Sequence, residues 1–303
     1  MRSFSTGVVS IDVWLTGIRA HVASQAPDVV SLLDPYIGEA RFGRAYLDQE
    51  LARLSPGAHV LEIGAGSMLL SCQLVREGYQ VSALEPVGIG FSHFSRLRTL
   101  VLDHAKACGC APVLLNQAAE QLALVDCVDF AFSINVMEHV NDVGSTIYRI
   151  AQCLKIGARY KFTCPNYLFP YEPHFNIFTF FSKRLTEKLL ARKIFDRPDI
   201  VDPADTWQSL NWITVPKVAS IASKIPSLET RFNTGLLVST VERMSTDQQF
   251  SARHSGWLRT TLLALMRFRI HLLLGVLPAA LQPVMDCVLI KRPIRGASDG
   301  RGQ

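Results

Sequence analysis

The stretch His59-Val-Leu-Glu-Ile-Gly-Ala-Gly-Ser67 decides the fold, because it has the composition of a buried strand that ends in a tight turn. Its apolar side chains predict the strand. Gly64 and Gly66 allow the backbone to turn closely beneath a ligand. Ser67 is expected to cap a helix over about 68–77.

A second strand is expected over 79–84, after Gly78, a residue suited to the left-handed end of a helix. This strand carries Glu85 to the edge of the sheet where the glycine turn lies. Acidic side chains in this position commonly bind the two hydroxyls of a ribose. Together the two strands predict a nucleotide-shaped site.

The rest of the chain continues the alternation of strands and helices. Apolar runs predict further strands over 112–116, 128–134 and 159–163, separated by helical segments. This order indicates an α/β fold with a doubly wound, mostly parallel sheet, which binds ligands at the carboxyl ends of its strands.

We expect four regions along the chain. The segment 165–226 is rich in aromatic residues and prolines and has no clear periodicity, which suits a wall facing the substrate. The regions are a helical N-terminal lid (1–55), a cofactor-binding α/β core (56–166), a substrate cap (167–230), and final strands with a basic apolar helical segment completing the sheet (231–303).

Composition limits the class of protein. The chain has 303 residues, of which 49% are hydrophobic and 19% charged, as expected of a globular protein. Its seven scattered cysteines and the lack of a secretory leader predict a reducing, cytoplasmic location. A net charge of +5 is too small to indicate nucleic-acid binding, so we expect no nucleic-acid partner.

The glycine turn does not fit a dinucleotide-binding fingerprint, because Leu69 stands where the third glycine is needed. The motif Leu-Glu-Ile-Gly-Ala-Gly, with Glu85 downstream, instead resembles that of the class I S-adenosylmethionine-dependent methyltransferases. The resemblance implies that Glu62, Gly64 and Gly66 face the methionine part of S-adenosylmethionine, and that Glu85 binds its ribose. The family's third glycine is Met68 here.

Three later segments also resemble this family, and the resemblance covers about 56–166 in all. Ala119-Glu120-Gln-Leu122 corresponds to the segment beside the adenine and makes Glu120 a candidate contact. Ser133 to Asp142 contains the family's Glu-His pair as Glu138-His139, with Asn135 as a further cofactor contact. Tyr160 to Asn166 matches the end of the fifth strand.

The candidate catalytic residues are His139 and His174. A histidine at the mouth of the crevice could take a proton from a substrate hydroxyl during in-line methyl transfer. Some relatives place Glu, Glu-His and a later His around a divalent metal, but the first acid of that set is Asn135 here. We therefore expect no metal, although Glu138, His139 and His174 remain a possible ligand set.

The acceptor is expected to be an oxygen of a small molecule, a sugar or a lipid-linked intermediate. The predicted substrate contacts are Tyr167, Phe169, Tyr171 and Phe175. Two other classes remain open: a nicotinamide-dependent oxidoreductase, which shares the sheet architecture, and a non-catalytic cofactor-binding scaffold at a membrane surface.

The segment 257–285 is the most apolar part of the chain. It contains no acidic residue, and Arg259, Arg267 and Arg269 alternate with leucine and aromatic side chains. Interrupting charges and prolines exclude a membrane-spanning helix. Two interpretations remain: a core helix leading into a last buried strand, which we favour, and an interfacial helix that makes the protein peripheral to the membrane.

Overall fold

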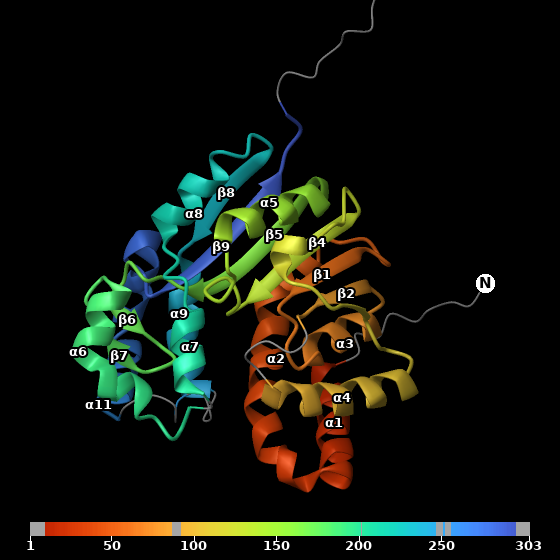
Figure 1. Ribbon diagram of the computed structural model, residues 1–303, viewed down its shortest axis with the longest axis horizontal. Coiled ribbons are helices and arrows are strands. Elements are labelled where there is room, and N and C mark those ends of the chain that lie inside the picture. The colour runs from red at the N-terminus through yellow and green to blue at the C-terminus, as the bar shows by residue number, and fades with distance from the viewer. Residues whose placement is uncertain (1–9, 87–91, 201, 247–250, 252–255, 295–303) are drawn as a thin grey trace, which may run out of the picture. The chain divides into compact units, whose positions relative to one another are not determined.

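The computed structural model describes residues 10–86, 92–200, 202–246, 251 and 256–294 (Figure 1). Its internal contacts divide the chain into two compact units, Met1–Gln117 and Ala118–Gln303.

The first unit contains three parallel strands in the order β3-β2-β1. The strands pair so that Ile63, Leu84 and Leu115 lie level with one another, and all three strands therefore end at one edge. The elements are α1 (Ile11–Gln25), the 3₁₀ turn η1 (Pro27–Val29), α2 (Val30–Leu51), β1 (His59–Ile63), α3 (Leu69–Arg76), β2 (Gln80–Leu84), α4 (Ser92–Ala107) and β3 (Val113–Leu115).

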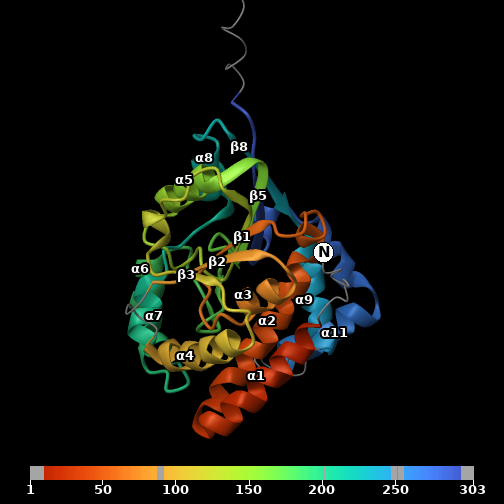
Figure 2. The same cartoon turned by 90° about the vertical axis from the view of Figure 1, so that its right-hand side faces the viewer.

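One apolar core joins the helices of this unit to the sheet. Buried side chains from α1, α2, α3 and α4 pack in a single cluster with Ala83 of β2. The indole of Trp14 also donates a hydrogen bond to the carbonyl of Leu69 (3.0 Å). Figures 1 and 2 both show α1, α2 and α3 on the same side of β1 and β2. The prediction of helices before the first strand is confirmed for the described residues.

The prediction that Ser67 caps α3 is wrong. The N-cap is Met68, which has a left-handed backbone (φ 64°) and makes no capping hydrogen bond through its side chain. The Met68 side chain is fully buried. The start of α3 is therefore fixed by burial of the Met68 side chain and not by a polar cap from Ser67. Gly78 behaves as expected, with φ 93°.

The second unit contains strands in the order β4-β5-β9-β8. β4 and β5 are parallel, whereas β9 runs antiparallel to both of its neighbours. Parallel strands separated by helices confirm the predicted α/β class, and β9 confirms the predicted last buried strand. The elements as far as the fifth strand are the 3₁₀ turn η2 (Ala119–Gln121), β4 (Val128–Ile134), α5 (Val143–Cys153) and β5 (Leu154–Pro165).

The segment after β5 is more regular than its composition indicated. It forms the hairpin β6 (Tyr171–Glu172) and β7 (Ile177–Phe178), followed by three helices. Ser182, Asp202 and Thr214 cap these helices through side-chain hydrogen bonds, and such polar starts were the available sequence signal. The helices are α6 (Lys183–Phe195), α7 (Pro203–Ser209) and α8 (Val215–Ala222).

The interpretation of the basic apolar segment as a core helix is wrong for much of its length. Phe268, Leu273 and Val276 are 70%, 63% and 78% exposed. No described helix is long and apolar enough to cross a membrane. The elements of this region are β8 (Leu228–Asn233), α9 (Gly235–Thr246), α11 (Gly256–Arg267), the 3₁₀ segments η3 (Ile270–Val276) and η4 (Ala279–Leu281), and β9 (Val284–Lys291).

Asn166, fully buried just after β5, fixes how the chain leaves the sheet. Its side-chain amide donates to the carbonyls of Ala280 (3.0 Å) and Gln282 (2.8 Å). Its side-chain oxygen accepts from the backbone N–H groups of Leu168 and Val215, both at 3.3 Å.

We expect Asn166→Asp to lower the free energy of unfolding by about 3 kcal/mol or more, because a carboxylate would face carbonyl oxygens where the amide now donates. Asn176→Asp is the control. The exposed side-chain oxygen of Asn176 accepts from Tyr171, and aspartate keeps that oxygen. Urea denaturation measures both variants, and equal losses would contradict this role of Asn166.

Candidate functional site

The turn after β1 is held to the end of β2. The backbone N–H groups of Gly64 and Ala65 both donate to the carbonyl of Leu84, at 2.8 and 3.1 Å. Gly64 and Gly66 have φ values of 72° and 48°, a region that L side chains rarely adopt. The two glycines therefore form the tight turn that the sequence predicted.

Glu85 is placed directly against this turn. Its Oε2 accepts a hydrogen bond from the backbone N–H of Gly66 at 3.0 Å. Burial raises the pKa of Glu85, while this hydrogen bond and the charge of Arg98 act in the opposite direction. A carboxylate can accept several hydrogen bonds, so this contact leaves acceptor capacity for hydroxyl groups of a ligand.

Glu62 is a buried acid at the end of β1. It is 7% exposed and accepts a short hydrogen bond from the hydroxyl of Ser71. Burial raises the pKa of Glu62 to about 8; the charge of Glu85 adds to this effect, and the Ser71 hydroxyl opposes it. A cationic group placed here would stabilise the ionised form. The first unit thus combines two acids and a glycine turn, a set that fits a cationic nucleoside.

Two further predicted cofactor contacts lie in the second unit. Asn135 follows β4 with a left-handed backbone (φ 54°), and its N–H donates to the carbonyl of Thr163 (2.8 Å). Glu120 accepts from the backbone N–H of Asp142 at 3.0 Å. The described contact of Glu120 is therefore to the N-cap of α5, and its role beside the adenine stays a prediction.

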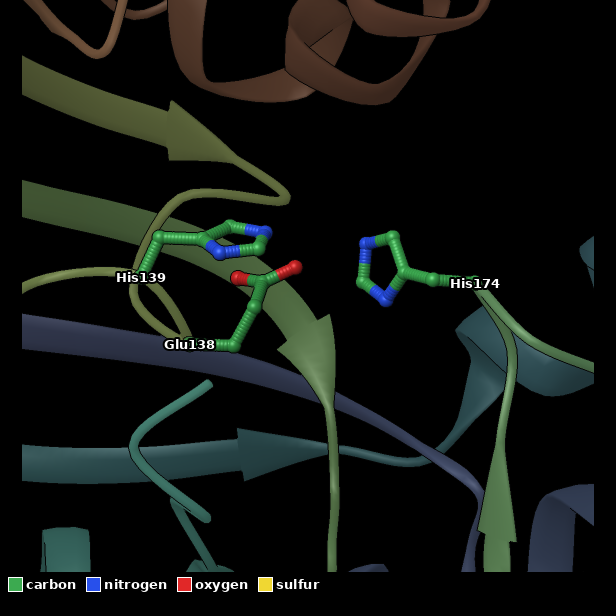
Figure 3. A group of neighbouring side chains, drawn as sticks. All are labelled: Glu138, His139 and His174. Atoms are coloured by element: carbon green, nitrogen blue, oxygen red, sulfur yellow. The ribbon is translucent and has the colours of Figure 1, made fainter. Parts of the chain in front are cut away.

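Glu138, His139 and His174 come together although 34 residues of chain separate the histidines. Their possible ligand atoms lie within 4.8 Å of one another (Figure 3). The two imidazole rings are 5.3 Å apart, at 72° to each other. Two imidazoles and a carboxylate can take part in proton transfer or bind a divalent cation.

The carboxylate of Glu138 is fully buried, and neither oxygen has a hydrogen-bond partner among the described residues. Burial raises the pKa of Glu138 to about 7, and the charge that His174 carries when protonated partly offsets this effect. Burying a carboxylate without hydrogen-bond partners costs folding free energy, so Glu138 is the member of this cluster that a ligand or a proton would stabilise most.

His139 is positioned by α7. Its Nδ1 lies 2.8 Å from the hydroxyl oxygen of Ser209. Burial, followed by the charges of His174 and Lys183, lowers the pKa of His139 to about 3. Asn211 fixes the backbone beneath it, because its N–H donates to the carbonyl of Glu138 (2.8 Å). His139 is therefore a neutral, firmly oriented imidazole.

His174 is paired with a buried carboxylate that the sequence analysis missed. Its Nδ1 lies 2.6 Å from Oε1 of Glu172, which is fully buried. Glu172 also accepts from the hydroxyl of Tyr167 (3.2 Å) and the N–H of Phe175 (2.7 Å). His174 itself is about one-third exposed. A carboxylate that orients a histidine in this way also stabilises its protonated form.

Of the four predicted substrate contacts, two are buried and two are half-buried. Tyr167 is buried and stacks on Trp212, with ring centroids 4.4 Å apart. Phe175 is buried with its ring edge against Trp207. The described contacts of these two rings are within the cap. The other two predicted contacts, Phe169 and Tyr171, are half-buried.

Ser209, Asn211 and Glu172 are the supporting residues that sequence reasoning did not identify. Ser209 and Asn211 lie about 70 residues beyond the Glu-His pair, with no spacing that relates them to it. Glu172 offered a weak signal, since it stands two residues before His174 in a proline-containing turn.

Comparison with known proteins agrees with this geometry. The family described as "Methyltransferase domain" matches residues 61–162. Uncharacterised proteins from two strains of Mycobacterium tuberculosis are each 45% identical over 282 residues, covering 93% of this chain and 95% of theirs.

Among solved structures, phosphoethanolamine N-methyltransferase 2 of Haemonchus contortus, in complex with S-adenosyl-L-methionine, is 16% identical, with a TM-score of 0.51. The match covers 95% of this chain and 61% of that one, and it supports the fold. The chain belongs to the class I S-adenosylmethionine-dependent methyltransferases. It is an enzyme of this class, and its cofactor is S-adenosylmethionine.

We expect the stability of the cofactor-free protein to fall between about pH 5 and pH 8 because of Glu62. The folded protein keeps this proton up to about pH 8, whereas an unfolded glutamate loses it near its ordinary pKa of 4.5. Stability from this group is therefore present at low pH and lost as the pH rises through that window.

Glu62→Gln should remove this loss, so the variant gains stability relative to the wild type as the pH rises. Urea denaturation at several pH values measures the difference. Ser24→Ala, an exposed substitution in the first unit that changes no titratable group, should show a difference that does not change with pH. A constant difference for Glu62→Gln would contradict the raised pKa.

Proposed function

We propose that the protein methylates a hydroxyl oxygen of a small-molecule, sugar or lipid-linked acceptor, and that His174 takes the acceptor proton. The observation that supports this most is the pairing of His174 with buried Glu172 at 2.6 Å. The nicotinamide alternative is not favoured, because the family match and Leu69 in the glycine turn both point away from it.

The cofactor contacts follow from the first unit. Glu62 is proposed to pair with the ammonium group of S-adenosylmethionine, and Glu85 to accept from its ribose hydroxyls. The backbone of Gly64 and Gly66 lets the ligand approach closely. When bound, the cofactor supplies an electrophilic methyl group on a sulfonium sulfur. For the second unit, taken by itself, Asn135 and Glu120 stay the proposed cofactor contacts.

His174 is a better candidate base than His139. The buried His139, with a pKa near 3, would be costly to protonate. His174 is partly exposed, and its Nδ1 faces a carboxylate that stabilises the imidazolium. His139 is proposed to position groups around the reacting oxygen as a neutral imidazole.

His174 is the general base in the proposed methyl transfer. The acceptor hydroxyl gives its proton to His174 while its oxygen forms a bond to the methyl carbon. The bound cofactor would supply this methyl group, and its sulfur would keep the electron pair of the carbon–sulfur bond as a neutral thioether. His174 then releases its proton to solvent. Half-buried Phe169 and Tyr171 are proposed to contact the acceptor, with Tyr167 and Phe175 supporting the cap.

We expect His174→Gln to lower the rate of methyl transfer by about 10²–10⁴-fold while cofactor binding stays within about twofold, because proton transfer of this kind contributes that range. The measurement is transfer of labelled methyl from S-adenosylmethionine to a cell extract, with mass spectrometry of the labelled product.

His21→Gln, the same substitution in the first unit, is the matched control and should leave the rate unchanged. Glu172→Gln should lower the rate less than His174→Gln does. Labelling of a nitrogen or carbon instead of an oxygen would contradict the acceptor chemistry, and full activity of His174→Gln would contradict the base.

One observation favours a second candidate in which a divalent cation activates the acceptor. Both buried oxygens of Glu138 lack partners among the described residues, and two imidazoles lie within ligand distance. Two histidines and a carboxylate suit Zn²⁺, Mn²⁺ or Fe²⁺. In that case His139 and His174 would be ligands.

The metal-free proposal predicts that exhaustive treatment with a chelator leaves the rate of methyl transfer unchanged within about twofold. The treated protein is assayed with and without added Mn²⁺ or Zn²⁺, and its metal content is measured by mass spectrometry. A chelator-induced loss that these ions restore in the wild type, but not in Glu138→Gln, would establish the cation-assisted candidate instead.

A further inference from the structure

The segment between α11 and β9 presents an ordered row of apolar side chains to solvent. We call this row the outward patch. Its members are between 36% and 78% exposed, and they are Phe268, Ile270, Leu272, Leu273, Val276, Leu277 and Leu281. Several exposed apolar side chains gathered in one short segment are a common feature of interaction sites.

The opposite side of the segment packs against α9. His271 is 6% exposed, and its Nε2 lies 3.4 Å from Oε1 of Glu242 on α9. A Cβ added to Gly275 would lie 3.2 Å from Cγ2 of Val238, so η3 lies close against α9. Figure 2 shows α9 and α11 on the same flank of the second unit.

Polar contacts fix the end of the segment. The side-chain amide of Gln282, which is 1% exposed, donates to the carbonyls of Thr234 (3.1 Å), Leu277 (3.1 Å) and Leu274 (3.3 Å). These bonds hold the backbone while the patch side chains stay outside the core. The exposed leucines therefore contribute little to folding, and their exposure needs another explanation.

The charges around the patch indicate the partner. Arg259, Arg267 and Arg269 are exposed, and the sequence has no acidic residue between Asp247 and Asp286. Two copies packed patch to patch would bring these arginines together, and no acid of the same segment would balance them. A bilayer with anionic lipids offers apolar depth and negative headgroups at the same boundary.

We propose that the outward patch docks the protein on the surface of a membrane that contains anionic lipids. The apolar side chains enter the boundary between headgroups and acyl chains, and the arginines contact lipid phosphates. The docking does not depend on which acceptor is methylated, so it can fail or succeed separately from the proposed function.

The test is co-sedimentation of the full chain with vesicles of phosphatidylcholine alone, or with about one-third phosphatidylglycerol. The wild type should bind the anionic vesicles at least about tenfold more tightly, and added salt should weaken this binding. Equal sedimentation with both vesicles, or none, would overturn the proposal.

Three double variants locate the surface. Leu273→Ser with Val276→Ser should weaken binding by about tenfold or more. Arg267→Gln with Arg269→Asn should weaken it by about fivefold per arginine, the factor that corresponds to about 1 kcal/mol per basic residue. Ile156→Ser with Val125→Ser changes side chains that are 68% and 62% exposed elsewhere in this unit, and should have no effect.

Cofactor binding, measured by calorimetry, should be the same in all variants and shows that they are folded. Light scattering of the wild type and of Leu273→Ser with Val276→Ser tests whether the patch binds a second copy of the chain instead of a membrane. A dimer that becomes a monomer in this variant would assign the patch to a second copy of the chain and overturn the membrane proposal, as would equal loss in the control.

Discussion

β1 and β2 end at the same edge of the sheet, and the proposed cofactor contacts of the first unit depend on this register. The pairing of Ile63 with Leu84 makes the carbonyl of Leu84 available to two N–H groups of the glycine turn. The same pairing brings Glu85 within 3.0 Å of Gly66. A shift of one residue would turn the strand-end side chains to the other face of the sheet, separating the two acids from the turn.

The two buried acids, Glu62 and Glu138, differ in the groups that surround their carboxylates. Glu62 shares a hydrogen bond with the Ser71 hydroxyl, and a cationic ligand would complete its environment. Among the described residues, no hydroxyl donates to Glu138, and the imidazoles of His139 and His174 lie within 4.8 Å of its carboxylate. Burial raises both pKa values, so each acid costs stability until a ligand, a proton or a neighbouring charge compensates for it.

The core strands were predictable because parallel strands, buried on both faces, have continuous apolar sequences; β4 was predicted over 128–134, where it lies. The positions of Glu62 in the first strand and of Gly64 and Gly66 in the turn after it were predictable for the same reason. Their contacts with the cofactor stay predictions. Met68 could not be predicted as an N-cap, because burial of its side chain depends on tertiary packing. Ser209 and Glu172 could not be predicted, because local signals such as N-cap residues mark where the helices of segment 167–230 begin but not which side chains meet the histidines.

Asn166 links the cap to the outward patch within the second unit. Its amide binds the carbonyls that end η4, and the next residue, Tyr167, donates its hydroxyl to Glu172. Glu172 in turn orients His174. A continuous set of hydrogen bonds and one peptide bond therefore connects the segment that carries the exposed leucines to the proposed base. Asn166 therefore fixes the exposed segment and the residues that orient His174 to the same strand end.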